Sequence, residues 1–97
     1  MEHNYLNIIS KEFNLECVYF FGNSNSVNDI DLIIVSDSFI GISLSKRKRL
    51  IKKNNKKLDP ICLTKKEFEK LRLSESSLWN ELLNNGKLIY GLEKRYN

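Results

Sequence analysis

The sequence predicts a single α+β domain over residues 1–97, in which a small mixed β-sheet is flanked by helices that we expect on one of its faces. Three observations lead to this fold class. A chain of 97 residues suffices for one core, and 41% hydrophobic with 29% charged residues is typical of a globular protein. Because the chain has only 4 Gly and 1 Pro, regular elements are favoured over long loops. Short apolar runs typical of strands alternate with segments of helical periodicity.

The first half of the chain predicts one helix and two strands. Residues 2–15 space their apolar side chains at helical intervals, which predicts an amphipathic helix. Residues 17–21 form a continuous aromatic and β-branched run, typical of a buried strand, and the polar residues 22–26 predict a turn. Residues 29–35 begin by alternating acid with aliphatic and predict a second strand. With so short a loop between them, the two strands should form an antiparallel hairpin or lie as sheet neighbours.

The middle of the chain predicts a connector at residues 36–41 and then a basic helix over residues 43–54. A third strand is expected at residues 57–63. The proline at its centre lacks a backbone N–H, and it favours extended geometry for Asp59 before it. We therefore expect this strand at a sheet edge, or the proline near a strand end.

The last third predicts two helices and a final extended segment. Thr64 and Glu67 have the spacing of a capping box, which starts a short helix. A further helix is expected at residues 76–84, with Gly86 as the residue that stops it. Residues 87–90 predict either a last short strand or an extended tail.

Composition excludes several classes of protein. Cys17 and Cys62 lie far apart in apolar runs, so we interpret them as reduced core residues of a cytoplasmic protein, not as a disulfide or metal site. The apolar stretches are too short to cross a bilayer, and the polar start does not resemble a signal peptide. His3 is the single histidine, which excludes Ser-His-Asp and Cys-His catalysis in practice.

Positive charge is concentrated in one segment. Residues 46–57 carry eight of the sixteen basic side chains and no acidic one, so the rest of the chain has a net charge of −4. The simplest interpretation is a solvated helix face. Two functional alternatives are attraction of a polyanion such as RNA or of an acidic partner, and guidance of a triphosphate toward Asp59.

The acidic residues of the second strand indicate a candidate site. Asp29 and Asp31 are two positions apart, so in a strand both carboxylates project from the same face. A divalent cation such as Mg²⁺ would relieve their repulsion; the alternative is a solvated pair at a sheet edge. Asp59 is a third acid, and Gly22 offers backbone amides that phosphates can approach closely. Together these are the groups that two-metal phosphoryl or nucleotidyl transfer requires.

With these residues in view, the chain resembles the minimal nucleotidyltransferase (MNT) domain of the DNA polymerase β superfamily. The resemblance begins with VYFFGN at 18–23 and NDIDLIIVSD at 28–37. It continues through LTKKEF at 63–68 and GKLIY at 86–90, and so covers nearly the whole chain. It implies a polymerase β-like nucleotidyltransferase fold, in which the order of elements agrees with the one predicted above.

The resemblance also implies an activity and its residues. Asp29 and Asp31 match the metal-binding pair, and Asp59 matches the carboxylate that binds the catalytic metal and helps to activate the acceptor hydroxyl. Gly22 matches the phosphate-loop glycine. These matches imply an enzyme that uses two Mg²⁺ ions and a nucleoside triphosphate. It would move AMP from ATP onto an acceptor, as in MNT proteins paired with a helical HEPN toxin.

The loop differs from the family pattern. Asn23 occupies the position of the family serine, Ser24 and Ser26 are the hydroxyls that could substitute for it, and the loop before Asp29 is shorter than usual. A domain that keeps the fold and acts by binding a partner is therefore one alternative to the enzyme, and an RNA-binding module that uses the basic helix is another. Because so short a chain has little room for an acceptor-binding region, we expect a partner chain or a homo-oligomer to complete the site.

Overall fold

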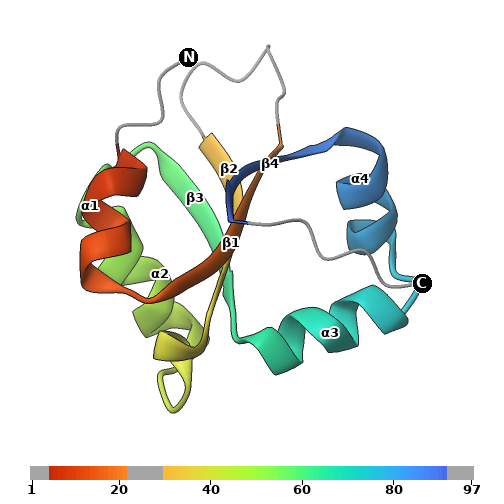
Figure 1. The fold of residues 1–97 in the computed structure, drawn as a ribbon, viewed down its shortest axis with the longest axis horizontal. Coiled ribbons are helices and arrows are strands. Elements are labelled where there is room, and N and C mark those ends of the chain that lie inside the picture. The colour runs from red at the N-terminus through yellow and green to blue at the C-terminus, as the bar shows by residue number, and fades with distance from the viewer. Residues whose placement is uncertain (1–4, 22–29, 92–97) are drawn as a thin grey trace.

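A computed structural model of the chain describes residues 5–21 and 30–91 (Figure 1). The predicted order of elements is confirmed, and every predicted helix and strand is present within a few residues of its expected bounds. In chain order the elements are α1 (Tyr5–Glu12), β1 (Leu15–Phe21), β2 (Ile30–Ser36), a 3₁₀ turn η1 (Asp37–Phe39), α2 (Leu44–Lys52), β3 (Leu58–Leu63), α3 (Lys65–Leu73), α4 (Ser77–Asn85) and β4 (Gly86–Gly91).

The four strands form one mixed sheet in the order β3-β2-β1-β4. β1 pairs antiparallel with β2, which confirms the predicted hairpin, and it also pairs antiparallel with β4. β2 pairs parallel with β3, and the crossover between them runs through η1 and α2. β3 is an edge strand, as its proline predicted, because Pro60 cannot donate a ladder hydrogen bond.

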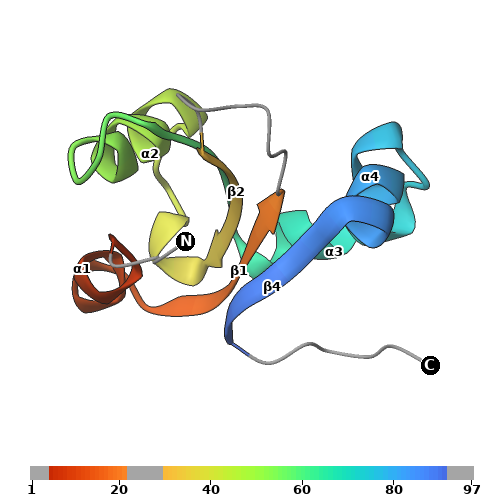
Figure 2. The ribbon, with the colours of Figure 1, turned by 90° about the horizontal axis from the view of Figure 1, so that it is seen from above.

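The helices cover both faces of the sheet, so the expectation that they pack on one face is wrong. Figures 1 and 2 show α1 and α2 on one side, here called the first face, and α3 and α4 on the other, the second face. In β2, Leu32 and Ile34 join the core of the first face, whereas Ile33 and Val35 join the core of the second. A strand buried on both faces is a continuous aliphatic run, and this run in β2 was the sequence signal for a second helical layer.

The two cysteines lie in different cores. Cys17 is buried on the second face and Cys62 on the first, and both are free thiols, as the apolar runs around them predicted. Burial raises the pKa of the Cys62 thiol to about 12, so it stays protonated and packs as a small apolar side chain. Within residues 5–21 and 30–91, no helix is long and apolar enough to span a bilayer.

The C-terminal segment is a strand, not a tail, and Gly86 begins it. Gly86 has φ −77° and extended geometry, so it does not end α4 in the left-handed conformation of a common C′ glycine. Its role is close packing, because a Cβ there would lie 2.4 Å from Leu82 Cδ1 and 2.6 Å from the Leu82 carbonyl oxygen. The turn from α4 into β4 therefore requires a residue without a side chain.

Hydroxyl side chains start three of the helices. Ser43 and Ser76 accept hydrogen bonds from backbone amides of the first turns of α2 and α4. At α3 the predicted capping box is confirmed: Thr64 Oγ1 accepts from the Glu67 N–H, and Glu67 Oε1 accepts from the Thr64 N–H. These caps satisfy amides that the helices cannot pair internally.

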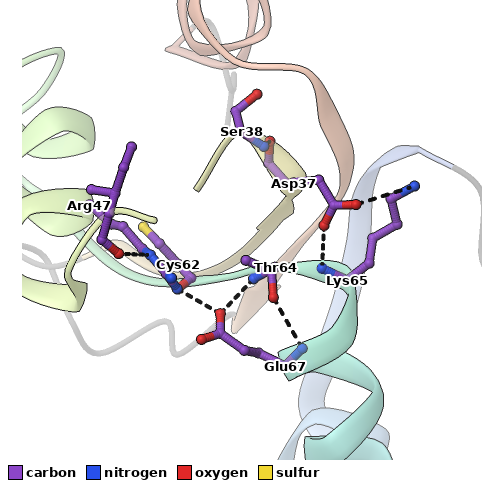
Figure 3. Close-up of polar contacts among 9 residues, drawn as sticks. Asp37, Ser38, Arg47, Cys62, Thr64, Lys65 and Glu67 are labelled. Atoms are coloured by element: carbon purple, nitrogen blue, oxygen red, sulfur yellow. Dashed lines mark hydrogen bonds and ion pairs between the residues drawn. The ribbon is translucent and has the colours of Figure 1, made fainter. Parts of the chain in front are cut away.

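One basic residue of the charged segment is buried. Arg47 donates to Glu67, the acid of the capping box, at 2.6 Å and to the Cys62 carbonyl oxygen at 3.1 Å. Figure 3 shows the pair that Arg47 forms with Glu67. Its Nε donates to the Ile42 carbonyl oxygen at 2.8 Å, and only 7% of its side chain is exposed. The prediction that the basic residues form a largely solvated helix surface is therefore wrong for Arg47, which ties α2 to β3 and to the start of α3.

We expect Arg47→Met to lower the free energy of unfolding by about 2–4 kcal/mol, because two carbonyl oxygens and a carboxylate lose their donor at a largely buried position. Urea unfolding measures this loss. Arg49→Met is the matched control, since it removes the same charge from an exposed position of α2 and should stay within about 0.5 kcal/mol of the wild type. Equal effects of the two substitutions would contradict the anchoring role.

Glu67 should make the free energy of unfolding depend on pH in the acidic range. The hydrogen bond from the Thr64 backbone, followed by that from Arg47, holds the pKa of Glu67 below its usual value of 4.5. The carboxylate therefore contributes stability above pH 4.5, which is lost as the pH falls through the lower folded-state pKa. The stability difference between wild type and Glu67→Gln should shrink below pH 4.5 in denaturant unfolding curves. Glu75→Gln changes an exposed carboxylate and is the control, so its stability should follow that of the wild type at every pH. A stability difference between wild type and Glu67→Gln that stays constant with pH would contradict this account.

Candidate active site

Two of the predicted acids lie side by side at the end of the sheet. In the parallel ladder Asp31 of β2 is the register partner of Asp59 of β3, and Phe21 of β1 pairs with Asp31 from the other side. Register partners project from the same face, and neighbouring strands are about 4.8 Å apart. Asp31 lies two and four positions before Ile33 and Val35 of the second-face core and so shares their face, to which both carboxylates therefore belong.

A pocket opens over this pair of acids. Its volume is about 190 Å³, and its lining consists of Phe21, Asp31, Leu32, Asp59, Ile61, Leu78 and Glu81. The sheet supplies the floor, and α4 supplies Leu78 and Glu81. Apolar side chains with a few convergent carboxylates are typical of a small-molecule site.

Asp59 is paired with a cation from the other side of the sheet. Lys48 Nζ, from α2 on the first face, lies 2.8 Å from Asp59 Oδ1, and the two side chains are 49% and 45% exposed. Because β3 is the edge strand, Lys48 reaches Asp59 around that edge. The hydrogen bond and the charge of Asp59 raise the pKa of Lys48, so the ammonium stays charged at neutral pH.

The chemistry of the donors suits a hard cation. Mg²⁺ is typically held by one or two carboxylates and completes its octahedron with water and substrate phosphate oxygens. Asp31 and Asp59 meet this requirement, since both face one open pocket and Asp59 already attracts a cationic group. Among the described residues no three His, Cys, Asp or Glu side chains gather closely enough to hold a metal by themselves. A cation here would take its other ligands from nucleotide and water.

The rest of the predicted site lies outside the described residues. These positions are Gly22, Asn23 and Ser24 of the predicted phosphate loop and Asp29 of the predicted metal pair. Their roles stay predictions from the sequence. The described chain resumes with Ile30 and Asp31 in β2, Phe21 ends β1 beside Asp31, and both Phe21 and Asp31 line the pocket.

Sequence reasoning did not assign Lys48, Leu78 or Glu81 to this site. Nothing local distinguishes Lys48 from its basic neighbours, because its contact with Asp59 depends on the strand order. Leu78 and Glu81 are three residues apart on α4, a spacing that places them on one helix face. That spacing was readable from the sequence, but the sheet end that this face covers was not.

The structure divides the basic segment among different contacts. Arg47 is buried, Lys48 pairs with Asp59, and Lys53 Nζ lies 3.5 Å from Glu12 of α1. Lys48 and Lys53 stay about half exposed in these pairs, and Lys46, Arg49, Lys56 and Lys57 are exposed as well. The RNA-binding alternative, which used the whole segment, thus loses the buried charge of Arg47, while Lys48 and Lys53 already face acidic partners.

Comparisons with known proteins agree with this fold. No protein-family model matches the sequence, and no curated protein sequence is significantly similar to it. Similar solved structures include a Sulfolobus solfataricus protein provisionally described as a nucleotidyltransferase, with a TM-score of 0.60 and 18% identity over 97% of this chain and 80% of that one. Another is a chain in the complex of a tri-AMPylated Shewanella oneidensis HEPN toxin with an MNT antitoxin, with a TM-score of 0.57 and 20% identity over 95% of this chain and 74% of that one.

The chain therefore has a nucleotidyltransferase-type α+β fold, and the resemblance stated from the sequence is confirmed for the fold. At these identities the likeness defines the architecture. The chemistry has to be argued from the residues of this chain.

Proposed function

We propose that this protein is a Mg²⁺-dependent nucleotidyltransferase that moves AMP from ATP onto a hydroxyl group of a HEPN-type partner. The observation that carries the proposal is the register pairing of Asp31 with Asp59 at the floor of a pocket, in a chain with a nucleotidyltransferase-type fold. The partner is proposed because one similar structure joins an MNT antitoxin to a tri-AMPylated HEPN toxin.

The proposed reaction balances without a further reactant. The acceptor oxygen attacks the α-phosphorus of ATP, a new O–P bond forms, and the bond to the β-phosphate oxygen breaks to release pyrophosphate. Mg²⁺, when bound, would neutralise charge on the phosphates and lower the pKa of the acceptor hydroxyl. Asp31 and Asp59 would hold the cation, and Asp59 would accept the hydroxyl proton. Phe21 and Leu78 give the pocket apolar walls that limit water near the reacting atoms.

The loop residues complete the proposal. We propose that backbone amides at Gly22, with the side chains of Asn23 and Ser24, contact the triphosphate, and that Asp29 shares the metal with Asp31. This assignment follows from the family resemblance, together with the attachment of the loop to Phe21 at the edge of the pocket.

ATP binding tests the site without knowledge of the acceptor. Calorimetry should detect binding that requires Mg²⁺ in the wild type and is roughly ten-fold or more weaker in Asp31→Asn, because one cation ligand loses its charge. Glu75→Gln, which removes a charge from an exposed position outside the pocket, should bind as the wild type does. Wild-type protein that binds no ATP with Mg²⁺ present would favour the alternative of a partner-binding protein without catalysis.

Transfer itself is tested with ATP labelled at the α- or γ-phosphate and a HEPN-type protein that forms a complex with the chain. Label should move to the partner only from the α-position, since the γ-phosphate leaves with pyrophosphate. Asp59→Asn should slow transfer by roughly 100-fold or more, because it removes a metal ligand and the proposed base. It should leave complex formation in size-exclusion chromatography unchanged. A stable complex that never becomes labelled would show that the protein acts by contact alone.

A further inference from the structure

Lys48 differs from the residue before it in how firmly it is held. Arg47 is largely buried and donates hydrogen bonds to groups on three other segments. If it left its position, each of these acceptors would lose a hydrogen-bond donor. Lys48 is half exposed, and its acidic partner among the described residues is Asp59. A lysine ammonium on a flexible stem exchanges one anionic partner for another readily, and an exposed pair of this kind stabilises a fold only slightly.

The position of Lys48 also conflicts with a cation at the same carboxylate. Its Nζ lies 2.8 Å from Asp59 Oδ1, which is hydrogen-bonding distance. A divalent cation bound by Asp31 and Asp59 would place two positive groups within a few ångströms of each other. Their repulsion disfavours simultaneous occupancy of Asp59, unless a further anion enters the site.

We propose that Lys48 is a displaceable counter-ion of Asp59, which yields to the divalent cation and then contacts a phosphate oxygen of the bound nucleotide. The proposal rests on the proposed function, because it needs a cation at Asp31 and Asp59. Before binding, the ammonium balances one of two neighbouring carboxylates at the pocket. After binding, a phosphate oxygen of the nucleotide replaces Asp59 as the anionic partner of the Lys48 ammonium. The flexible lysine side chain can reach both partners.

The test separates binding of the cation from binding of the nucleotide. Mn²⁺, used as a spectroscopic substitute for Mg²⁺, is titrated alone into wild type, Lys48→Met and Lys46→Met, and free Mn²⁺ is measured by electron paramagnetic resonance. Lys46→Met is the matched control, since it removes the same charge from an exposed position of α2 away from the pocket lining. ATP is then titrated calorimetrically at saturating Mn²⁺.

Lys48→Met should bind Mn²⁺ alone roughly two- to five-fold more tightly than the control, because no ammonium has to be displaced. It should bind ATP at saturating Mn²⁺ roughly two- to five-fold more weakly, because the phosphate contact is lost. Binding of Mn²⁺ by Lys48→Met but not by the wild type would overturn displacement, because the ammonium would then block the cation instead of yielding to it.

Equal Mn²⁺ affinities of Lys48→Met and Lys46→Met, with the wild type also binding, would overturn the role of Lys48 and leave the proposed function intact. Tighter Mn²⁺ binding without weaker ATP binding would overturn the phosphate contact and keep the displacement. No binding of Mn²⁺ alone by any of the three proteins would overturn displacement of Lys48 by the cation, whereas the proposed function would still be decided by the ATP titration with Mg²⁺ present.

Discussion

The parallel pairing of β2 with β3 is the constraint on which the candidate site depends. Side chains alternate between faces along a strand, so a slip of one residue would carry Asp59 to the first face, away from Asp31. Such a slip is strongly opposed, because β2 is buried on both faces and β3 buries Leu58 and Cys62 on the first face. Leu32 and Leu58 are fully buried in the first-face core, while Ile33 is fully buried in the second. The packing of the hydrophobic cores thus holds Asp31 beside Asp59, although neither carboxylate is part of a core.

The polar contacts at the opposite end of β3 support the same register. Arg47 connects α2 to the Cys62 carbonyl oxygen and to Glu67, so the crossover helix, the edge strand and the start of α3 share one buried guanidinium. Asp37 adds a second link, because its carboxylate accepts a hydrogen bond from the Lys65 backbone at 2.9 Å (Figure 3). An edge strand without a neighbour on its outer side is held in this way at the end remote from the acids.

The basic segment shows how one sequence feature can serve several structural purposes. Adjacent residues on α2 point in different directions, so Arg47 enters the protein interior while Lys48 extends around the sheet edge. A count of charges along the sequence cannot separate a buried anchor from a side chain at the site. Their roles differ because α2 crosses from β2 to β3 with a particular face toward the sheet.

The sequence by itself determined the order of the elements, the type of all but the last, the capping box at Thr64 and the candidate acids. These are local properties, set by the spacing of side chains within a few contiguous residues. The phosphate loop and Asp29 stay sequence predictions, since they lie outside the described residues. Only the tertiary structure decided that helices cover both faces, that Asp31 adjoins Asp59, and that Lys48 joins them. Strand partners, register and helix placement arise from burial between segments distant in the chain, and no local pattern records which distant segments will meet.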